Sequence, residues 1–163
     1  RLHVCGKPNG HSQLWINLEG GGKVDYANTR PGDFINFDGG FWYRFGRHFY
    51  MEPKYTRERM EVDEGWLYTT SIGQLQTSWQ FNPRCFIRAI IQYVDNQFNP
   101  ELYSDGRDPE DRRLFAQFLF SYKLNPRTVL FVGYSDNSAA TQDYGFTQTD
   151  RTIFAKVGYA WVL

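Results

Sequence analysis

The chain has 163 residues, enough for one domain with a sizeable core, and its 18 Lys and Arg residues balance its 18 Asp and Glu residues. This balance excludes a global charge that would draw the protein to nucleic acid. No stretch approaches the roughly 20 apolar residues of a transmembrane helix. The aromatic content of 18% is nevertheless high for a soluble domain. Aromatic girdles at two membrane interfaces would account for it, as would a sandwich core or a ligand-lined cavity.

Alternation of apolar and polar residues predicts an all-β chain of about eight strands. After an irregular lead over 1–11, the strands are expected at 12–20, 36–46, 48–60, 66–81, 84–94, 113–124, 127–135 and 151–162. Most are longer than the ~5–6 residues of globular strands and match the ~9–11 of a tilted membrane strand. The sequence therefore predicts one domain over 1–163, with its strands within 12–163.

The connections differ in length at the two ends of the expected strands. Three tight turns, at 45–48, 81–84 and 124–127, contain Gly or Asn-Pro, which favour turns. The links at 20–35, 95–112 and 136–150 are long and polar, and 61–65 is shorter. Short turns at one end and long loops at the other are typical of an antiparallel up-and-down transmembrane β-barrel of the bacterial outer membrane. An even strand number would place both chain ends on the short-turn side.

Each strand has one apolar and one mixed polar set of side chains. A soluble barrel of the lipocalin type would bury the apolar set, whereas a membrane barrel exposes it to lipid. Small residues in the polar sets and aromatic residues near strand ends favour the membrane barrel, because the former suit a narrow lumen and the latter form belts at headgroup level. The belts are expected from Phe45, Phe49, Trp79, Phe81, Tyr122 and Trp161 at the short-turn end and from Tyr93 and Tyr134 at the other.

This interpretation assigns a position to each set. The residues expected to face lipid are Leu14, Ile16, Leu18, Ile87, Ile91, Phe118, Phe120, Leu130, Val132, Val157, Tyr159 and Trp161. Those expected to line the lumen are Glu19, Asp38, Arg44, Glu52, Lys54, Glu58, Arg88, Lys123 and Lys156. In a barrel of eight strands these charges would pair and fill the interior, whereas in a larger barrel they would line an aqueous path.

The last strand resembles the C-terminal signature of outer-membrane barrels. A polar residue at Lys156 is followed by Gly158, the aromatic Trp161 and a terminal hydrophobic residue, Leu163, in place of the more usual Phe. The resemblance implies that the barrel-assembly machinery recognises this strand.

Longer runs resemble one uncharacterised family. They are LFAQFLFSYKLNP at 114–126, TVLFVGYSD at 128–136 and TDRTIFAKVGYAW at 149–161, with GWLYTT at 65–70 and FIRAI at 86–90 upstream. In that family an N-terminal domain similar to a family 9 carbohydrate-binding module precedes a C-terminal outer-membrane barrel of unknown function. The similarity covers roughly 60–163 well, but the module is absent here, as is much of the expected barrel length. The resemblance therefore implies either the C-terminal part of a larger protein or a short barrel.

The sequence indicates no catalytic constellation, cofactor or metal site. The histidines His3, His11 and His48 are not set beside a Ser and an acid as an acyl-transfer triad requires. The acidic loop 105–111 lacks EF-hand spacing and is expected to be solvated rather than to hold Ca²⁺. Cys5 and Cys85 fall near the same barrel end, so a bridge is conceivable, but two unpaired thiols are favoured. Four aromatic residues fall in the expected loops, namely Tyr26, Tyr103, Tyr144 and Phe146. They could bind glycans or a protein, or serve as packing anchors.

These observations favour a non-enzymatic outer-membrane barrel that serves as an anchor, scaffold or subunit of a cell-surface assembly. Its expected partners are the lipid bilayer, the assembly machinery and other envelope proteins that contact the long loops. A segment of a larger transport pore is the first alternative, and a soluble ligand-binding barrel is the second. Because the chain begins at Arg1 with no signal peptide, the sequence leaves open whether more strands precede it.

Overall fold

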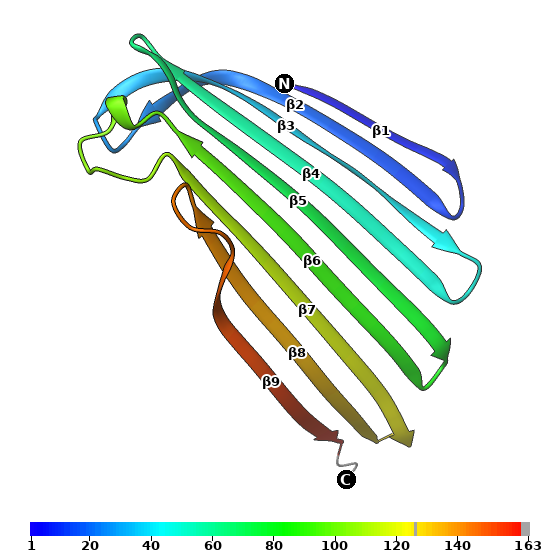
Figure 1. Cartoon of the computed structure of the whole chain (residues 1–163). Coiled ribbons are helices and arrows are strands. Elements are labelled where there is room, and N and C mark those ends of the chain that lie inside the picture. Colours follow the sequence, from blue (N-terminus) through cyan, green and yellow to red (C-terminus); the bar gives the residue numbers. More distant parts are fainter. Residues whose placement is uncertain (126, 161–163) are drawn as a thin grey trace.

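The computed structural model describes residues 1–125 and 127–160, which form one antiparallel sheet (Figure 1). Its order is β1 to β9 along the chain, so every strand pairs with its sequence neighbours. A single turn of 3₁₀ helix, η1 (Pro100–Leu102), lies between β6 and β7. The strands are β1 (Leu2–Asn9), β2 (Ser12–Asp25), β3 (Arg30–Phe45), β4 (Phe49–Val62), β5 (Gly65–Asn82), β6 (Cys85–Phe98), β7 (Glu110–Asn125), β8 (Thr128–Thr141) and β9 (Thr147–Tyr159).

The expected up-and-down antiparallel all-β fold is confirmed, but the described sheet is open rather than closed. In the strand order β1 and β9 are the two edges, and no pairing joins them within residues 1–125 and 127–160. Within those same residues, no helix is long and apolar enough to cross a membrane.

The strand number differs from the prediction because residues 2–9, expected to be irregular, form β1. Leu2 and Val4 pair with Leu18 and Ile16 of β2. Gly6 and Pro8 hide the strand signal in the sequence, since both residues are rare in central strands, but an edge strand tolerates them. Nine strands place the N-terminal end of the sheet opposite the short turns, so the prediction that both chain ends lie on the short-turn side is wrong.

The long links were also overestimated. Most of 20–35 belongs to β2 and β3, which are joined by residues 26–29 alone. The strands β6 and β8 continue to Phe98 and Thr141, so the remaining loops cover 99–109 and 142–146. Gly and polar side chains weaken the alternation there, but ladder hydrogen bonds between long neighbouring strands do not depend on side-chain polarity. Loop asymmetry is therefore smaller than the sequence predicts.

Three of the short turns share one side-chain device. The Oδ1 atoms of Asn9, Asn82 and Asn125 each accept a hydrogen bond from the backbone N–H two residues later, at 2.9, 2.8 and 2.9 Å. Such Asx turns reverse the chain without a longer loop. The β3–β4 turn instead uses Gly46 at a φ of 60°, which glycine adopts without a Cβ clash.

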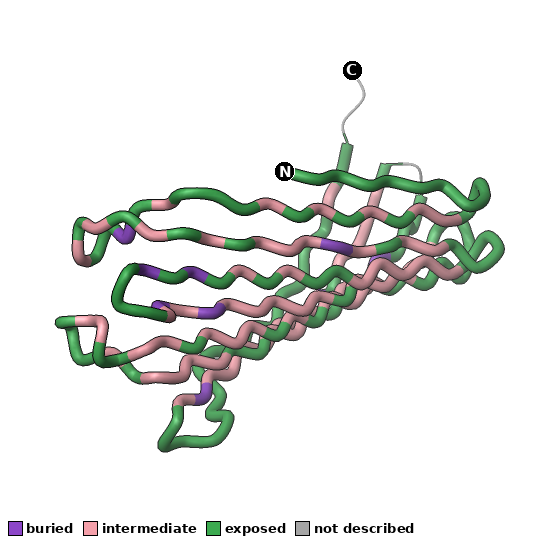
Figure 2. Tube along the Cα trace, turned by 90° about the horizontal axis from the view of Figure 1, so that it is seen from above, coloured by how far each residue is buried: buried purple, intermediate pink, exposed green. Residues whose placement is uncertain are grey.

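The two faces of the sheet differ in exposure. Along β2, exposed Leu14, Ile16 and Leu18 alternate with half-buried polar and aromatic side chains, and β3 shows a similar alternation over much of its length (Figure 2). Phe118, Ile91 and Val157 are 45%, 40% and 65% exposed. The apolar side chains are thus on the outside of the curved sheet, which we name the convex face, and the half-buried polar ones line the concave face.

Curvature toward the polar face is also evident from contacts between strands that are not neighbours. Lys23 of β2 reaches Glu58 of β4 at 2.6 Å and the hydroxyl of Tyr68 of β5 at 3.1 Å. These side chains cross β3, which lies between β2 and β4 in the sheet. The small buried core lies at the same end of the sheet, where Met60, Val62 and Leu67 pack against the β6–β7 loop.

Candidate functional site: the polar concave face

All nine charged residues expected to line a lumen lie on the concave face. The register connects Ser78, Arg88, Leu119 and Gly133 across four strands, and residues two apart on a strand share a face. The adjacent row connects Trp79, Ile87, Phe120, Val132 and Ala155 on the convex face. By the same register, every residue expected to face lipid lies on the convex face except Trp161, which is outside the described residues.

Between β1 and β5, most of the concave charges have partners. Asp38 accepts hydrogen bonds from the amide of Asn17 at 2.8 Å and from the hydroxyl of Thr56 at 3.1 Å. Glu52 forms an ion pair with Lys54 at 2.9 Å and accepts a hydrogen bond from Tyr50. Together with the Lys23–Glu58–Tyr68 contacts, these bonds satisfy the carboxylates in the centre of the face, and a charged, hydrogen-bonded surface of this kind is compatible with water.

Between β5 and β9, the concave face carries cations that lack acidic partners. Within the described residues no salt bridge involves Arg88, Lys123 or Lys156, and the same holds for Arg44 on β3. The Nε atom of Arg88 is buried and has no hydrogen-bond partner in this part of the chain. Pairing of these charges is expected of a filled barrel of eight strands, and the open sheet does not test that expectation.

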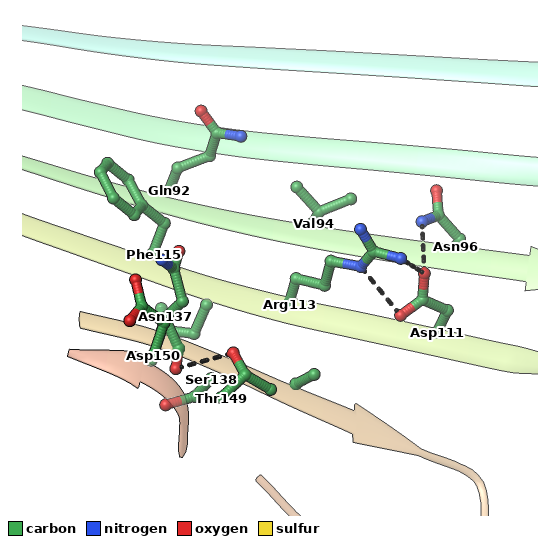
Figure 3. A pocket seen from close by; sticks show the side chains of 12 residues that line it. Gln92, Val94, Asn96, Asp111, Arg113, Phe115, Asn137, Ser138, Thr149 and Asp150 are labelled. Atoms are coloured by element: carbon green, nitrogen blue, oxygen red, sulfur yellow. Dashed lines mark hydrogen bonds and ion pairs between the residues drawn. The ribbon is translucent and has the colours of Figure 1, made fainter. Parts of the chain in front are cut away.

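A depression of about 740 Å³ follows the concave face near the β6–β7 and β8–β9 loops. Its polar side chains come from β6, β7, β8 and β9. Figure 3 shows the Arg113 guanidinium bound to Asp111 and the amide of Asn96 directed to the same carboxylate. Asn137 and Asp150 lie on the far side of the depression. The surface thus offers a polar solute hydrogen-bond donors, hydrogen-bond acceptors and charges of both signs.

The β6–β7 loop folds over the concave face at the opposite end from the short turns. Its Leu102 carbonyl accepts hydrogen bonds from Asn28 at 3.2 Å and from Arg30 at 2.9 Å, and Arg30 also pairs with Asp25 at 3.0 Å. Tyr103 packs against the small core. The loop is therefore fastened to the β2–β3 turn across the face, where it narrows the space above β4 and β5.

One ion pair shapes the tip of this loop. The Arg107 guanidinium lies 3.7 Å from the centre of the Tyr103 ring and donates a 3.0 Å hydrogen bond to Asp105. That hydrogen bond holds the pKa of Asp105 below its usual value. Burial raises the pKa of Tyr103, in keeping with its packing against the small core. Tyr26 and Tyr144 remain exposed, and the ring centres of Phe146 and Tyr93 are 6.3 Å apart.

The aromatic side chains at the short-turn end form a continuous row on the convex face. The ring centres of Phe45 and Phe49 are 5.6 Å apart, those of Phe49 and Trp79 are 5.6 Å apart, and those of Trp79 and Phe81 are 6.4 Å apart. This placement is as the sequence predicts. Tyr134 differs, because β8 continues to Thr141 and leaves Tyr134 near the middle of its strand.

Among the other chemistry-bearing residues, His11 and His48 line one depression at the short-turn end. Cys5 and Cys85 are both free thiols, in line with the favoured prediction. His48 donates to the carbonyl of Gln80 at 2.6 Å, and His3 hydrogen-bonds Asn17. Within residues 1–125 and 127–160 no cluster of three or more His, Cys, Asp or Glu side chains is arranged to hold a metal ion.

Sequence reasoning missed a separation of charge along the strands. The segments 6–13, 43–50, 79–88, 121–131 and 155–160, which meet at the short-turn end, contain no Asp or Glu. Asp38, Glu52 and Asp136 lie near the middle of their strands, and most other acidic residues fall nearer the other end. The basic residues of the short-turn segments are Lys7, Arg44, Arg47, Arg84, Arg88, Lys123, Arg127 and Lys156. Sorting charges by turn type would have found this signal in the sequence.

No family model matches the chain, and no curated protein matches it. Among solved structures, the outer membrane channel DcaP of Acinetobacter baumannii is similar at 11% sequence identity and a TM-score of 0.50. The match covers 98% of this chain and 61% of the channel, so the chain spans less than two thirds of its length. At this identity the similarity shows the fold alone, which is an antiparallel up-and-down β-sheet.

Proposed function

We propose that the chain forms part of the wall of a bacterial outer-membrane β-barrel that encloses an aqueous transport path. One observation carries the proposal: the convex face is exposed and apolar along the strands, whereas the concave face is polar and charged. A soluble barrel would have the opposite arrangement, with the apolar side chains inside. Lipid accepts the convex side chains of β2, β6, β7, β8 and β9 without exposing them to water.

A second argument supports a barrel wider than the described sheet. An unpaired strand edge in hydrocarbon leaves backbone N–H and C=O groups without hydrogen bonds, which costs several kcal/mol for each group. The edges at β1 and β9 therefore require further strands, either from the same polypeptide or from another copy. Eight strands leave just enough interior for side chains, and the diameter grows with strand number, so a barrel with many further strands encloses a water-filled lumen. The unneutralised cations Arg88, Lys123 and Lys156 fit such a lumen better than a packed interior.

In this proposal Lys156 and Gly158 of β9 belong to the signal read by the barrel-assembly machinery, together with Trp161 and Leu163 outside the described residues. The proposed role is not enzymatic, and the engagement of His48 with the backbone carbonyl of Gln80 supports it. The relation to the family with the carbohydrate-binding-like module remains part of the proposal, since it depends on sequence similarity alone.

Single-channel recording in planar bilayers tests the proposal. The full-length protein, natively folded, is expected to conduct, and Arg88→Glu is expected to shift the permeability ratio toward cations because it reverses a charge on the aqueous path. Arg59→Glu is the matched control, because Arg59 lies on the convex face and pairs with Glu61 at 2.6 Å. The intact mass of the mature protein shows whether the additional strands belong to the same polypeptide or to another copy.

A folded, inserted protein that does not conduct would contradict the transport role. That result would favour the second candidate, an anchor or scaffold of a cell-surface assembly. The exposed side chains of Tyr26 and Tyr144 in the β2–β3 and β8–β9 loops support this alternative, because large exposed aromatics are typical of contact sites.

A further inference from the structure

Two turns at the short-turn end have the same construction. In each, an Asn side chain accepts a hydrogen bond from the backbone N–H of an arginine two residues later: Asn82 with Arg84 at 2.8 Å and Asn125 with Arg127 at 2.9 Å. Both arginines are exposed. The Asx hydrogen bond thus fixes a cation at the same position in two neighbouring turns.

An apolar side chain of the convex face precedes each of these turns. Phe81, immediately before Asn82, is 51% exposed, and Leu124, immediately before Asn125, is 53% exposed. Each turn therefore presents an apolar side chain followed by a cation. This order suits the boundary between hydrocarbon and headgroups, where aromatic and apolar groups lie in the membrane and arginine reaches the polar layer.

A surface depression beside the β5–β6 turn places other polar groups next to Arg84. It has a volume of about 380 Å³ and is lined by Asn82, Pro83, Arg84 and Tyr122. Tyr122 belongs to the convex face of β7 and is paired with Cys85. A guanidinium, a phenol hydroxyl and an amide are together suited to hydrogen-bond the oxygens of an anion.

The charge at this end of the sheet is not neutralised by the protein itself. The short-turn segments contain no acidic residue, and within the described chain no salt bridge involves Arg84 or Arg127. By contrast, Arg59 and Arg112, on the convex face near the other end, pair with Glu61 at 2.6 Å and Glu110 at 3.4 Å. Arg84 and Arg127 are thus available to an external anion, whereas Arg59 and Arg112 are neutralised by their own neighbours.

We propose that the short-turn rim of the convex face binds the phosphate groups of anionic phospholipids, with Arg84 and Arg127 as the principal cations and Tyr122 beside Arg84. The proposal rests on the membrane orientation proposed above. Charge complementarity selects this occupant, because a rim of apolar groups followed by unpaired arginines matches acyl chains followed by phosphates. Each arginine near an anionic surface contributes about 1 kcal/mol, which corresponds to roughly a fivefold preference.

Spin-labelled lipids test this proposal in the full-length protein reconstituted in phosphatidylcholine bilayers. The measured quantity is the association constant of labelled phosphatidylglycerol relative to labelled phosphatidylcholine, taken from the motionally restricted lipid. We expect a severalfold preference for phosphatidylglycerol at low salt. The variant Arg84→Gln/Arg127→Gln should bring the ratio close to one, and so should high salt, which screens the charges.

The control variant Arg59→Gln/Arg112→Gln removes the same number of charges from the convex face and should retain the preference. Equal ratios for the wild type and the Arg84→Gln/Arg127→Gln variant would overturn the lipid-binding proposal while leaving the barrel intact. If neither labelled lipid is motionally restricted, the protein is not embedded in the bilayer, and the proposed function itself fails.

Discussion

Lys23 of β2 and Glu58 of β4 form a 2.6 Å ion pair although β3 separates their strands. Such a pair forms where a sheet bends toward the face that carries both side chains. We predict that a double-mutant cycle of Lys23→Met and Glu58→Gln yields a coupling free energy of about 0.5–1 kcal/mol, reduced by solvent because both side chains are partly exposed. Chemical unfolding in detergent micelles measures it, and a coupling of zero would indicate that the two strands are not held together on this face.

Gly133 of β8 lies against an aromatic ring that leaves no room for a side chain. A Cβ at this position would overlap the ring of Phe154 on the adjacent strand. Gly133→Ala should therefore destabilise the sheet by about 1–3 kcal/mol, the usual cost of overpacking. Additional truncation by Phe154→Ala should recover much of the loss.

Gly73 provides the control for this prediction, since a Cβ there meets nothing within 4 Å and Gly73→Ala should be nearly neutral. Thermal unfolding followed by the change in electrophoretic mobility between folded and unfolded protein reports all three variants. Equal stability of Gly133→Ala and the wild type would show that the β8–β9 register differs from the one described.

The β6–β7 loop should respond to acid through Asp105. The hydrogen bond from Arg107 lowers the pKa of Asp105 in the folded loop. The ionised carboxylate therefore stabilises the loop in full at pH values above 3.8, the usual pKa of this group. This contribution is lost as the pH falls through the lower folded value. Amide hydrogen exchange of 99–109 should hence be insensitive to pH near neutrality and accelerate, after correction for intrinsic rates, only in strong acid.

Asp105→Asn tests the cause of this acid response. The variant lacks the carboxylate at every pH, so its loop should exchange faster at neutral pH and show a smaller acid response than the wild type. A variant loop as protected as the wild type would mean that the Asp105–Arg107 pair does not hold the loop.

Neighbouring residues of β7 should tolerate a charge very differently. Phe118 lies on the convex face and Gln117 on the concave face, and both are near the middle of the strand. In a bilayer, Phe118→Arg should destabilise the protein by about 2–4 kcal/mol, because it places a cation in hydrocarbon, whereas Gln117→Arg should have little effect. Equilibrium unfolding from lipid vesicles gives both values, and similar costs for the two would argue against a lipid-facing convex side.

The sequence contained the elements of the fold that depend on local alternation and turn chemistry. The run 120–124 alternates strictly, and the strands β5 and β7 end at the Asn residues of the Asn-Pro pairs, Asn82 and Asn125. The assignment of Ile87 and Arg88 to opposite faces of β6 followed from parity alone. Successive side chains point to opposite faces in any extended strand, so this assignment does not depend on how the strands pair.

Features that depend on pairing with other strands were not predictable in this way. The strand β1 contains Gly6 and Pro8, and the end of β8 contains Ser138 and two alanines, so neither shows clear alternation. Their neighbours supply the ladder hydrogen bonds that define them. Likewise, the contact of Arg30 with the Leu102 carbonyl joins residues far apart in the chain, and no local pattern indicates it.

Cysteine labelling at two adjacent positions of β6 tests most directly which face contacts lipid. After Cys5 and Cys85 are replaced by serine, single cysteines are introduced as Ile91→Cys and Gln92→Cys in the full-length protein in vesicles. A water-soluble maleimide should modify the cysteine at position 92, on the aqueous concave face, and leave the one at position 91 protected by lipid. Rapid modification at 91 together with protection at 92 would contradict the account.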